Sequence, residues 1–282
     1  MPVTLAPAAR SLAAALLAGA LALPGSAAAQ GFAGAYLAAE HAAMRGDLSA
    51  AADYYEKALA RDGDNARLME RAMTHQIAAG RLPQGIALAR SLDATRPDQH
   101  LSMLVLSVDA LKRGDAARAA AELETDGDGS TAFVGRIMRA WALFGTGDMD
   151  AALAALDELE AGGAGGPAGE TLAAYHTGLI EAATGDDADA AEAFARAAEG
   201  AGTGNTRIAR ARAGALARLG RSEEAVGVLD EAVARLLSAP RIAALADEIR
   251  AGESPGPTVT DAPGGAAEAL FQVARYLTGG SN

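Results

Sequence analysis

Apolar and polar positions follow a helical period along most of the chain, and short polar segments interrupt it at regular distances. In the stretch GDLSAAADYYEKALARDGDN, residues 46–65, apolar side chains recur every few positions after a glycine–aspartate turn. Ala51, Tyr55 and Ala58 fall on one face of this helix, and a polar segment ends it. The same alternation continues to about residue 234, so the pattern predicts an all-α chain.

Glycines mark the turns between these helices at a nearly constant distance. Gly46, Gly80 and Gly114 are 34 residues apart, and the next three intervals, which end at Gly220, are 33, 38 and 35 residues. A small, a large apolar and a small residue follow several of these glycines at offsets of 5, 9 and 12. One helix pair cannot cover its own apolar faces, so successive pairs must stack. The pattern therefore predicts a solenoid of stacked antiparallel helix pairs.

This repeat resembles the tetratricopeptide repeat, a helix pair of about 34 residues with glycine in its turn. The resemblance covers residues 32–234, and 266–282 in part. It implies a right-handed α-solenoid of about six repeats plus a partial one. The repeats are expected at 32–65, 66–99, 100–132, 133–170, 171–205 and 206–240.

Two segments rich in glycine interrupt the repeats. AGGAGGPAG, residues 161–169, is predicted to be a flexible insertion between helices, and AGESPGPTVTDAPGG, residues 251–265, a linker after a solenoid domain of residues 30–250. Residues 266–282 are typical of the first helix of another repeat. Two interpretations follow: this helix caps the solenoid, or the chain is a fragment of a longer protein.

The first 29 residues have the three-part form of a secretory signal peptide. An apolar run from Ser11 to Leu23 is followed by Pro24 and then by small residues up to Ala29, after which cleavage is expected. The run is too short for a spanning helix, which needs about 20 residues. An uncleaved anchor is the alternative. The sequence predicts an exported bacterial protein, periplasmic or secreted, without stable membrane insertion after cleavage.

Charge and cysteine content exclude several classes of partner and chemistry. The net charge of −12 becomes −13 when Arg10 leaves with the signal peptide. An acidic chain is repelled by nucleic acid and anionic lipid, so neither is expected as a partner. The chain contains no cysteine, which excludes disulfides, thiolate metal sites and cysteine nucleophiles.

Candidate chemical motifs are incomplete. ETDGDGS, residues 124–130, has alternating acids but lacks the glutamate that closes a calcium loop, so it is interpreted as an acidic loop. GGAGGPAGE lacks the lysine and hydroxyl residue of a phosphate loop. His41 and His75 lie 34 residues apart and supply fewer ligands than a closed metal site needs. No enzymatic activity, metal or cofactor is expected.

The resemblance implies that the first helices of the pairs line an inner groove, the usual binding surface of such proteins. Its expected partner-binding residues are Tyr36, Arg67, Arg71, Leu104, Trp141, Tyr175, Arg207 and Arg210. Trp141, the only tryptophan, is the expected anchor, because aromatic and arginine side chains often dominate binding. The alternative is that the apolar ones belong to the core, because the register differs or because the chain's own C-terminal segment fills the groove.

These observations predict a non-enzymatic scaffold in the cell envelope that binds a protein or peptide segment in its groove. One alternative is a carbohydrate or cell-wall ligand, for which Tyr36, Trp141 and Tyr175 are the aromatic candidates. Another is that the chain is the regulatory N-terminal part of a longer protein.

Overall fold

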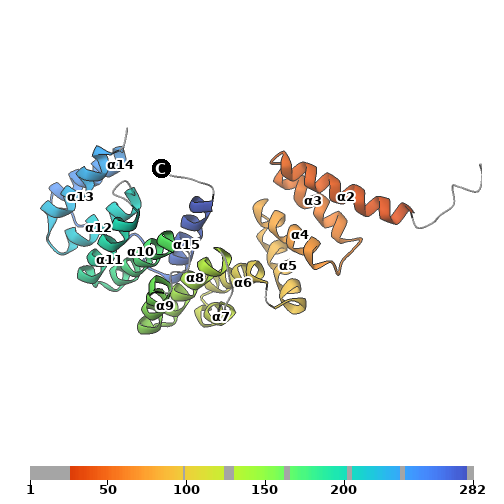
Figure 1. Ribbon diagram of the computed structural model, residues 1–282, viewed down its shortest axis with the longest axis horizontal. Helices are drawn as coiled ribbons and strands as arrows, with labels where there is room; N and C mark the ends of the chain where they lie inside the picture. The colour runs from red at the N-terminus through yellow and green to blue at the C-terminus, as the bar shows by residue number, and fades with distance from the viewer. Residues whose placement is uncertain are drawn as a thin grey trace, which may run out of the picture. The chain divides into compact units, whose positions relative to one another are not determined.

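The computed structural model describes residues 26–97, 99–123, 130–161, 166–201, 205–235 and 239–277. These residues form fourteen helices and no strand, which confirms the all-α prediction (Figure 1). From α2 to α5 and from α6 to α14, helices that follow one another in the sequence pack side by side as helix pairs. By its contacts the chain divides after Arg96 into two compact units, called unit 1 and unit 2.

Unit 1 contains two helix pairs. Its helices are α2 (Ser26–Met44), α3 (Leu48–Leu59), α4 (Ala66–Ala78) and α5 (Leu82–Thr95). The two pairs stack through α3 and α4. Tyr55 and Ala58 are fully buried between them, where the sequence predicted a close approach of neighbouring helices.

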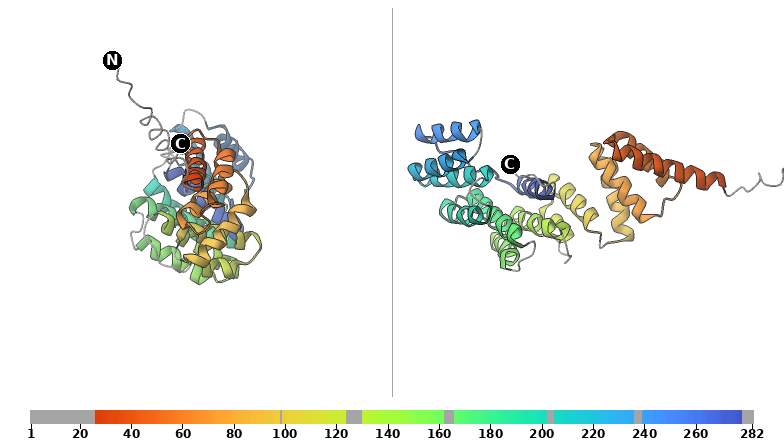
Figure 2. Two further views of the ribbon diagram at one scale, coloured as in Figure 1. Left: turned by 90° about the vertical axis from the view of Figure 1, so that its right-hand side faces the viewer. Right: turned by 45° about the horizontal axis from the view of Figure 1, so that its top comes forward.

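Unit 2 contains four further pairs and two additional helices. Its helices are α6 (His100–Lys112), α7 (Ala116–Glu122), α8 (Ser130–Thr146), α9 (Met149–Ala161), α10 (Gly166–Thr184), α11 (Asp187–Ala201), α12 (Thr206–Arg218), α13 (Ser222–Ala234), α14 (Pro240–Arg250) and α15 (Ala262–Leu277). From α6 to α14 each helix packs on the next. The last helix, α15, instead returns to α8, and Figure 2 shows it, in dark blue, beside the middle of unit 2.

The turn glycines have the conformation that their spacing predicted. All six, from Gly46 to Gly220, have φ between +74° and +90°, a region that other residues adopt only at a cost. An aspartate follows four of them, and in the first turn Asp47 Oδ1 accepts the backbone N–H of Ala50 at 3.0 Å and caps α3. A seventh turn of this kind, at Gly252, follows α14.

Some predicted boundaries differ from the structure. Residues 166–169, predicted to be part of a flexible insertion, form the first turn of α10. The predicted linker ends early, because α15 begins at Ala262 rather than at residue 266. The sequence analysis did not identify α14 as a separate helix. The acidic segment 124–129 and residues 1–25, which include most of the expected signal peptide, lie outside the described residues. No described helix is both long and apolar enough to cross a membrane.

Candidate functional site

The last helix, α15, lies on the first helices of the pairs in unit 2. It packs on α8 and also contacts α6 and α10, whereas α7, α9 and α11 are second helices (Figure 1). We call the faces of α6, α8, α10 and α12 that meet α15 and residues 253–261 the inner surface. The buried residues of α15 are mostly small: Ala262, Gly265, Ala266, Glu268, Ala269 and Val273. Small side chains let the helix backbones approach closely.

Gly265 lies directly against the ring of Trp141. A Cβ atom added to Gly265 would be 1.8 Å from the indole carbon Cδ2, far inside contact distance. Trp141 itself is fully buried, and Phe144 packs edge-on against it with ring centroids 5.4 Å apart. Only a residue without a side chain fits at this position of α15.

Trp141 and His176 form a buried polar pair beneath α15. The Nε1–H group of Trp141 donates a hydrogen bond to Nδ1 of His176 at 2.9 Å. Because Nδ1 accepts, the neutral ring carries its hydrogen on Nε2, which has no hydrogen-bond partner among the described residues. Complete burial lowers the pKa of His176 to about 4, since a charged ring is costly in an apolar interior. His176 is therefore neutral at pH 7.

Glu268 is the acidic residue of α15, and groups from two other helices bind its carboxylate. Arg207 Nε donates to Oε1 at 2.8 Å, and the Nη2 group of the same guanidinium contacts Oε2. Tyr175 donates its hydroxyl to Oε1 at 3.2 Å, and Gln272 its amide at 3.0 Å. Burial alone would raise the pKa of Glu268, but the hydrogen bonds and charge of Arg207 outweigh it and lower the pKa. The carboxylate is charged and specifically recognised.

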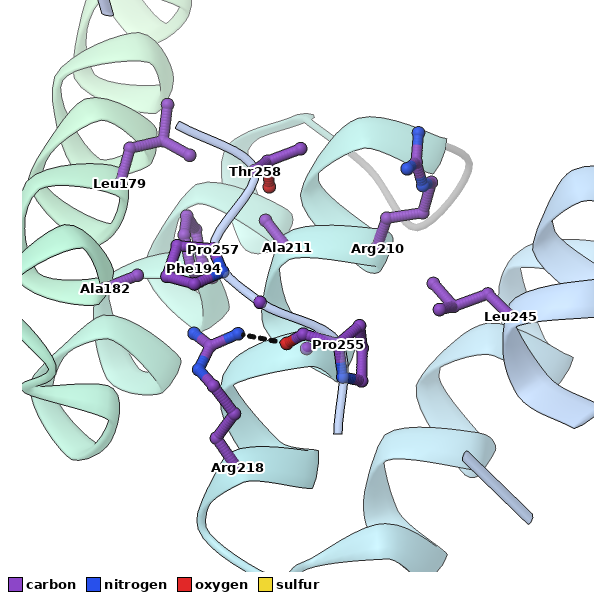
Figure 3. A pocket seen from close by; sticks show the side chains of 12 residues that line it. Leu179, Ala182, Phe194, Arg210, Ala211, Arg218, Leu245, Pro255, Pro257 and Thr258 are labelled. Atoms are coloured by element: carbon purple, nitrogen blue, oxygen red, sulfur yellow. Dashed lines mark hydrogen bonds between the residues drawn. The ribbon is translucent and has the colours of Figure 1, made fainter. Parts of the chain in front are cut away.

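The segment before α15 lies in extended form on α12. Arg218 Nη1 donates to the carbonyl oxygen of Pro255 at 2.7 Å (Figure 3). The same guanidinium is held by Asp187 Oδ1 at 2.6 Å. Ser254 Oγ donates to the carbonyl oxygen of Ala217 at 3.3 Å. The cavity left beside this segment holds about 50 Å³, below the roughly 300 Å³ of typical small-molecule sites.

Unit 2 contains five of the predicted partner-binding residues, but not in a free groove. Trp141 and Tyr175 are buried beneath α15 and Leu104 is buried, which corrects the expectation that they are exposed. The physical reason is that the C-terminal segment of the chain covers Trp141 and Tyr175, whereas Leu104 lies in the core near Gly135 of α8. Arg207 is engaged by Glu268, whereas Arg210 is exposed at the edge of the cavity in Figure 3. Whether these residues bind a partner stays a prediction.

The other three predicted residues lie in unit 1. Arg67 is exposed, and Arg71 pairs with Glu40 at 3.2 Å. Tyr36 is half-buried and packs edge-on against Tyr55 with ring centroids 6.1 Å apart. Tyr55 donates its hydroxyl to Glu40. This hydrogen bond, and beyond it the charge of Arg71, lowers the pKa of Glu40.

Sequence reasoning missed several residues that shape the inner surface. His176, Arg218, Gly265 and Glu268 were not among the predicted site residues. One signal was present: Glu268 is the single acidic residue in the mostly apolar segment APGGAAEALFQVARYL. A lone acid at the centre of an apolar helix face indicates a buried partner of opposite charge.

Acidic side chains gather at one further place. Within the described ranges, oxygens of Glu181, Asp186 and Asp189 lie within 4.8 Å of one another. Asp186 accepts the backbone N–H of Asp189 at 3.4 Å, as a residue that caps α11 would. Burial, and next the charge of Asp186, raises the pKa of Glu181.

The comparisons with known proteins identify the architecture. No protein-family model matches the chain. No curated protein is significantly similar to it in sequence. Among solved structures it resembles a tetratricopeptide repeat protein from Parabacteroides merdae, with a TM-score of 0.61 and 12% identity, over 87% of this chain and 99% of that one.

Two other solved structures are more distant. One is the MamA protein, with a TM-score of 0.41 and 15% identity over 75% of this chain and 100% of that one. The other is a thermophilic TPR protein from Thermus thermophilus, with a TM-score of 0.32 and 18% identity over 78% of this chain and 98% of that one.

Proposed function

We propose that this chain, which has the fold of tetratricopeptide repeat proteins, is a non-enzymatic scaffold that binds a protein or peptide segment on its inner surface. One observation carries the proposal. The inner surface already holds polypeptide in two forms, the helix α15 and the extended residues 254–258. Its contacts with them use side-chain packing, a carboxylate and a backbone carbonyl, which are features of polypeptide in general.

The alternative of a carbohydrate ligand has less support. Such a site needs exposed aromatic rings, and of the three candidates Trp141 and Tyr175 are buried. The acidic net charge of −12 argues against nucleic acid as a partner. The remaining alternative, a regulatory part of a longer protein, is compatible with the same binding surface.

The proposed location is the cell envelope, and the support for it is the form of the first 29 residues. The mass and N-terminal sequence of the native protein check this proposal. A mature chain that begins at Gln30 and is recovered from the periplasmic fraction or the medium is expected. A cytoplasmic chain that begins at Met1 would contradict it.

The binding proposal is tested by photo-crosslinking in cells. A photo-reactive residue replaces Arg210 at the edge of the inner surface, or Glu223 on α13 as an exposed control outside it. One dominant protein adduct at position 210, absent at position 223, is the expected result. If position 210 gives no protein adduct while the chain is folded and abundant, the scaffold proposal fails.

A further inference from the structure

Two features distinguish the interface of α15 from the contacts between helix pairs. Its buried apolar residues are Ala262, Ala266, Ala269 and Val273, which belong to the core cluster of unit 2 but offer less apolar area than the Leu, Phe and Trp side chains contributed to it by α8–α13. It also removes the charged Glu268 from water, and desolvation offsets much of what the ion pair gains. The helix is thus positioned by a few specific contacts more than by buried apolar area.

Helix α15 leaves one buried polar group beneath it without a hydrogen bond to the described residues. Nε2 of His176 is buried without a hydrogen-bond partner among the described residues. At the edge of this interface, Phe271 remains 44% exposed, with the guanidinium carbon of Arg207, which also binds Glu268, 4.4 Å from its ring centroid. An incompletely satisfied buried group favours release of the helix, because water can then reach it.

The connection to the rest of the chain would permit such release. Residues 251–261 form no helix, and they contain Gly252, Pro255, Gly256 and Pro257. Arg218 holds this segment through one backbone carbonyl, and Ser254 through one hydroxyl. From α6 to α14 each helix contacts its neighbours in sequence, so these contacts between neighbours do not run through α15.

We propose that α15 is an internal ligand that occupies the inner surface until a partner helix of the same chemistry displaces it. This inference rests on the proposed function and specifies its partner class. The partner helix needs a glycine to face Trp141 and a glutamate three residues later to pair with Arg207 and Tyr175, as Gly265 and Glu268 do in α15. Release leaves the Arg207 guanidinium without its carboxylate, so the surface selects an acidic rather than a basic helix.

The first test uses Trp141 as a built-in reporter, since it is the only tryptophan in the chain and lies under Gly265. Gly265→Leu blocks docking of α15, and Ala267→Leu adds the same side chain on its exposed face as the control. Gly265→Leu should shift the emission of Trp141 to longer wavelength and increase its quenching by acrylamide, at unchanged helix content of α6–α14. Emission that matches that of Ala267→Leu would overturn the proposal.

The second test measures binding of a labelled peptide with the sequence of residues 262–277 to the full-length chain. The peptide should bind the Gly265→Leu chain at least about tenfold more tightly than the wild-type chain, whose surface is occupied. A peptide with Glu268→Gln should bind the Gly265→Leu chain at least about tenfold more weakly than the natural peptide does. Adding Arg207→Glu to the chain should abolish binding of the natural peptide, and a Glu268→Arg peptide should restore it. Equal binding of all peptides would overturn the proposal, and restoration by the charge exchange shows that the variants remain folded.

Crosslinking at position 210 separates this inference from the proposed function. A higher yield of the same protein adduct in the Gly265→Leu chain than in wild type supports both. An equal yield in the two chains overturns the displacement inference and leaves the scaffold proposal standing. Peptide binding without any protein adduct in either chain overturns the proposed function and, with it, the partner class inferred here.

Discussion

Trp141 and His176 illustrate how a single hydrogen bond fixes a protonation state. Nδ1 of His176 must stay unprotonated to accept the indole N–H group at 2.9 Å. A proton added there would break this bond and place a charge on a fully buried ring. Both effects oppose protonation, which agrees with the lowered pKa of about 4.

This depressed pKa predicts a loss of stability in acid. In the unfolded chain His176 binds a proton near pH 6.5, whereas in the folded chain it does so only near pH 4. Below about pH 6.5 the unfolded state binds more protons, so the free energy of unfolding falls with pH until about 4, by roughly 3 kcal/mol in total. Urea unfolding at several pH values measures this.

His176→Gln is the matched variant, because its amide oxygen can accept the indole N–H but does not titrate. Its unfolding free energy should fall less steeply than that of wild type between pH 6.5 and 4. Glu268 keeps its own contribution in both chains, and that contribution is lost as pH falls through the lowered pKa of the carboxyl. Identical slopes in the two chains would show that His176 is not the group responsible.

Ala58 is a second residue whose size matters, because it is fully buried between helices of unit 1. Ala58→Leu inserts three carbon atoms into a packed contact and should cost about 1–3 kcal/mol of unfolding free energy. Thermal melting measures the effect. Ala78→Leu, an exposed position at the end of α4, is the control and should change stability little. An unchanged melting temperature for Ala58→Leu would contradict the close approach of these helices.

At the scale of elements, the turn between two helices requires glycine because of its backbone conformation and not because a side chain would lack room. Gly80 has φ of +78°, and a Cβ atom added there would meet nothing within 4 Å. Gly80→Ala should therefore cost roughly 1–2 kcal/mol from conformation alone. Gly227, within α13, also has open space but an ordinary helical φ. Gly227→Ala should stabilise the chain by roughly 0.5–1 kcal/mol, and chemical unfolding of both variants checks the opposite signs.

The helix pairs could be predicted from the sequence because their determinants are local. A glycine that ends one helix and small residues at the contact lie within each repeat, and in four of the six repeats an aspartate follows the glycine, so most repeats carry an independent copy of the signal. Helix α14 lacks this redundancy. The segment Pro240–Arg250 ends at a glycine turn, Gly252, but no second helix of its own follows, so only part of the repeat pattern marks it.

The position of α15 could not be predicted in the same way. The segment was predicted to be helical, but its place depends on complementarity with residues far away in the sequence. Gly265 is required only because the ring of Trp141 lies against it. Glu268 can be buried only because Arg207 and Tyr175 bind its carboxylate. From the sequence, Trp141, Tyr175 and Arg207 are predicted to share one surface, and either a partner or the chain's own C-terminal segment could cover it.

At the scale of the whole molecule, non-covalent contacts hold each compact unit together, since the chain has no cysteine for a disulfide. Hydrogen exchange should therefore report on each unit separately. Gly265→Leu is expected to increase exchange of the amides of α15 and to leave those of α2–α5 as in wild type. Mass spectrometry of peptides from both chains measures this. Faster exchange throughout unit 1 would show that α15 contributes to the stability of the whole chain rather than of unit 2.

The short non-helical segment 251–261 keeps α15 on the same polypeptide as the surface it covers. A short flexible tether holds its end at an effective concentration on the order of millimolar. A free helix present at micromolar concentration competes with the tethered α15, whose effective concentration is about a thousand times higher. To displace α15, the free helix must bind the bare surface about a thousandfold more tightly than α15 does. The tether thus sets an affinity threshold, below which abundant but weakly matching helices in the surroundings are ignored.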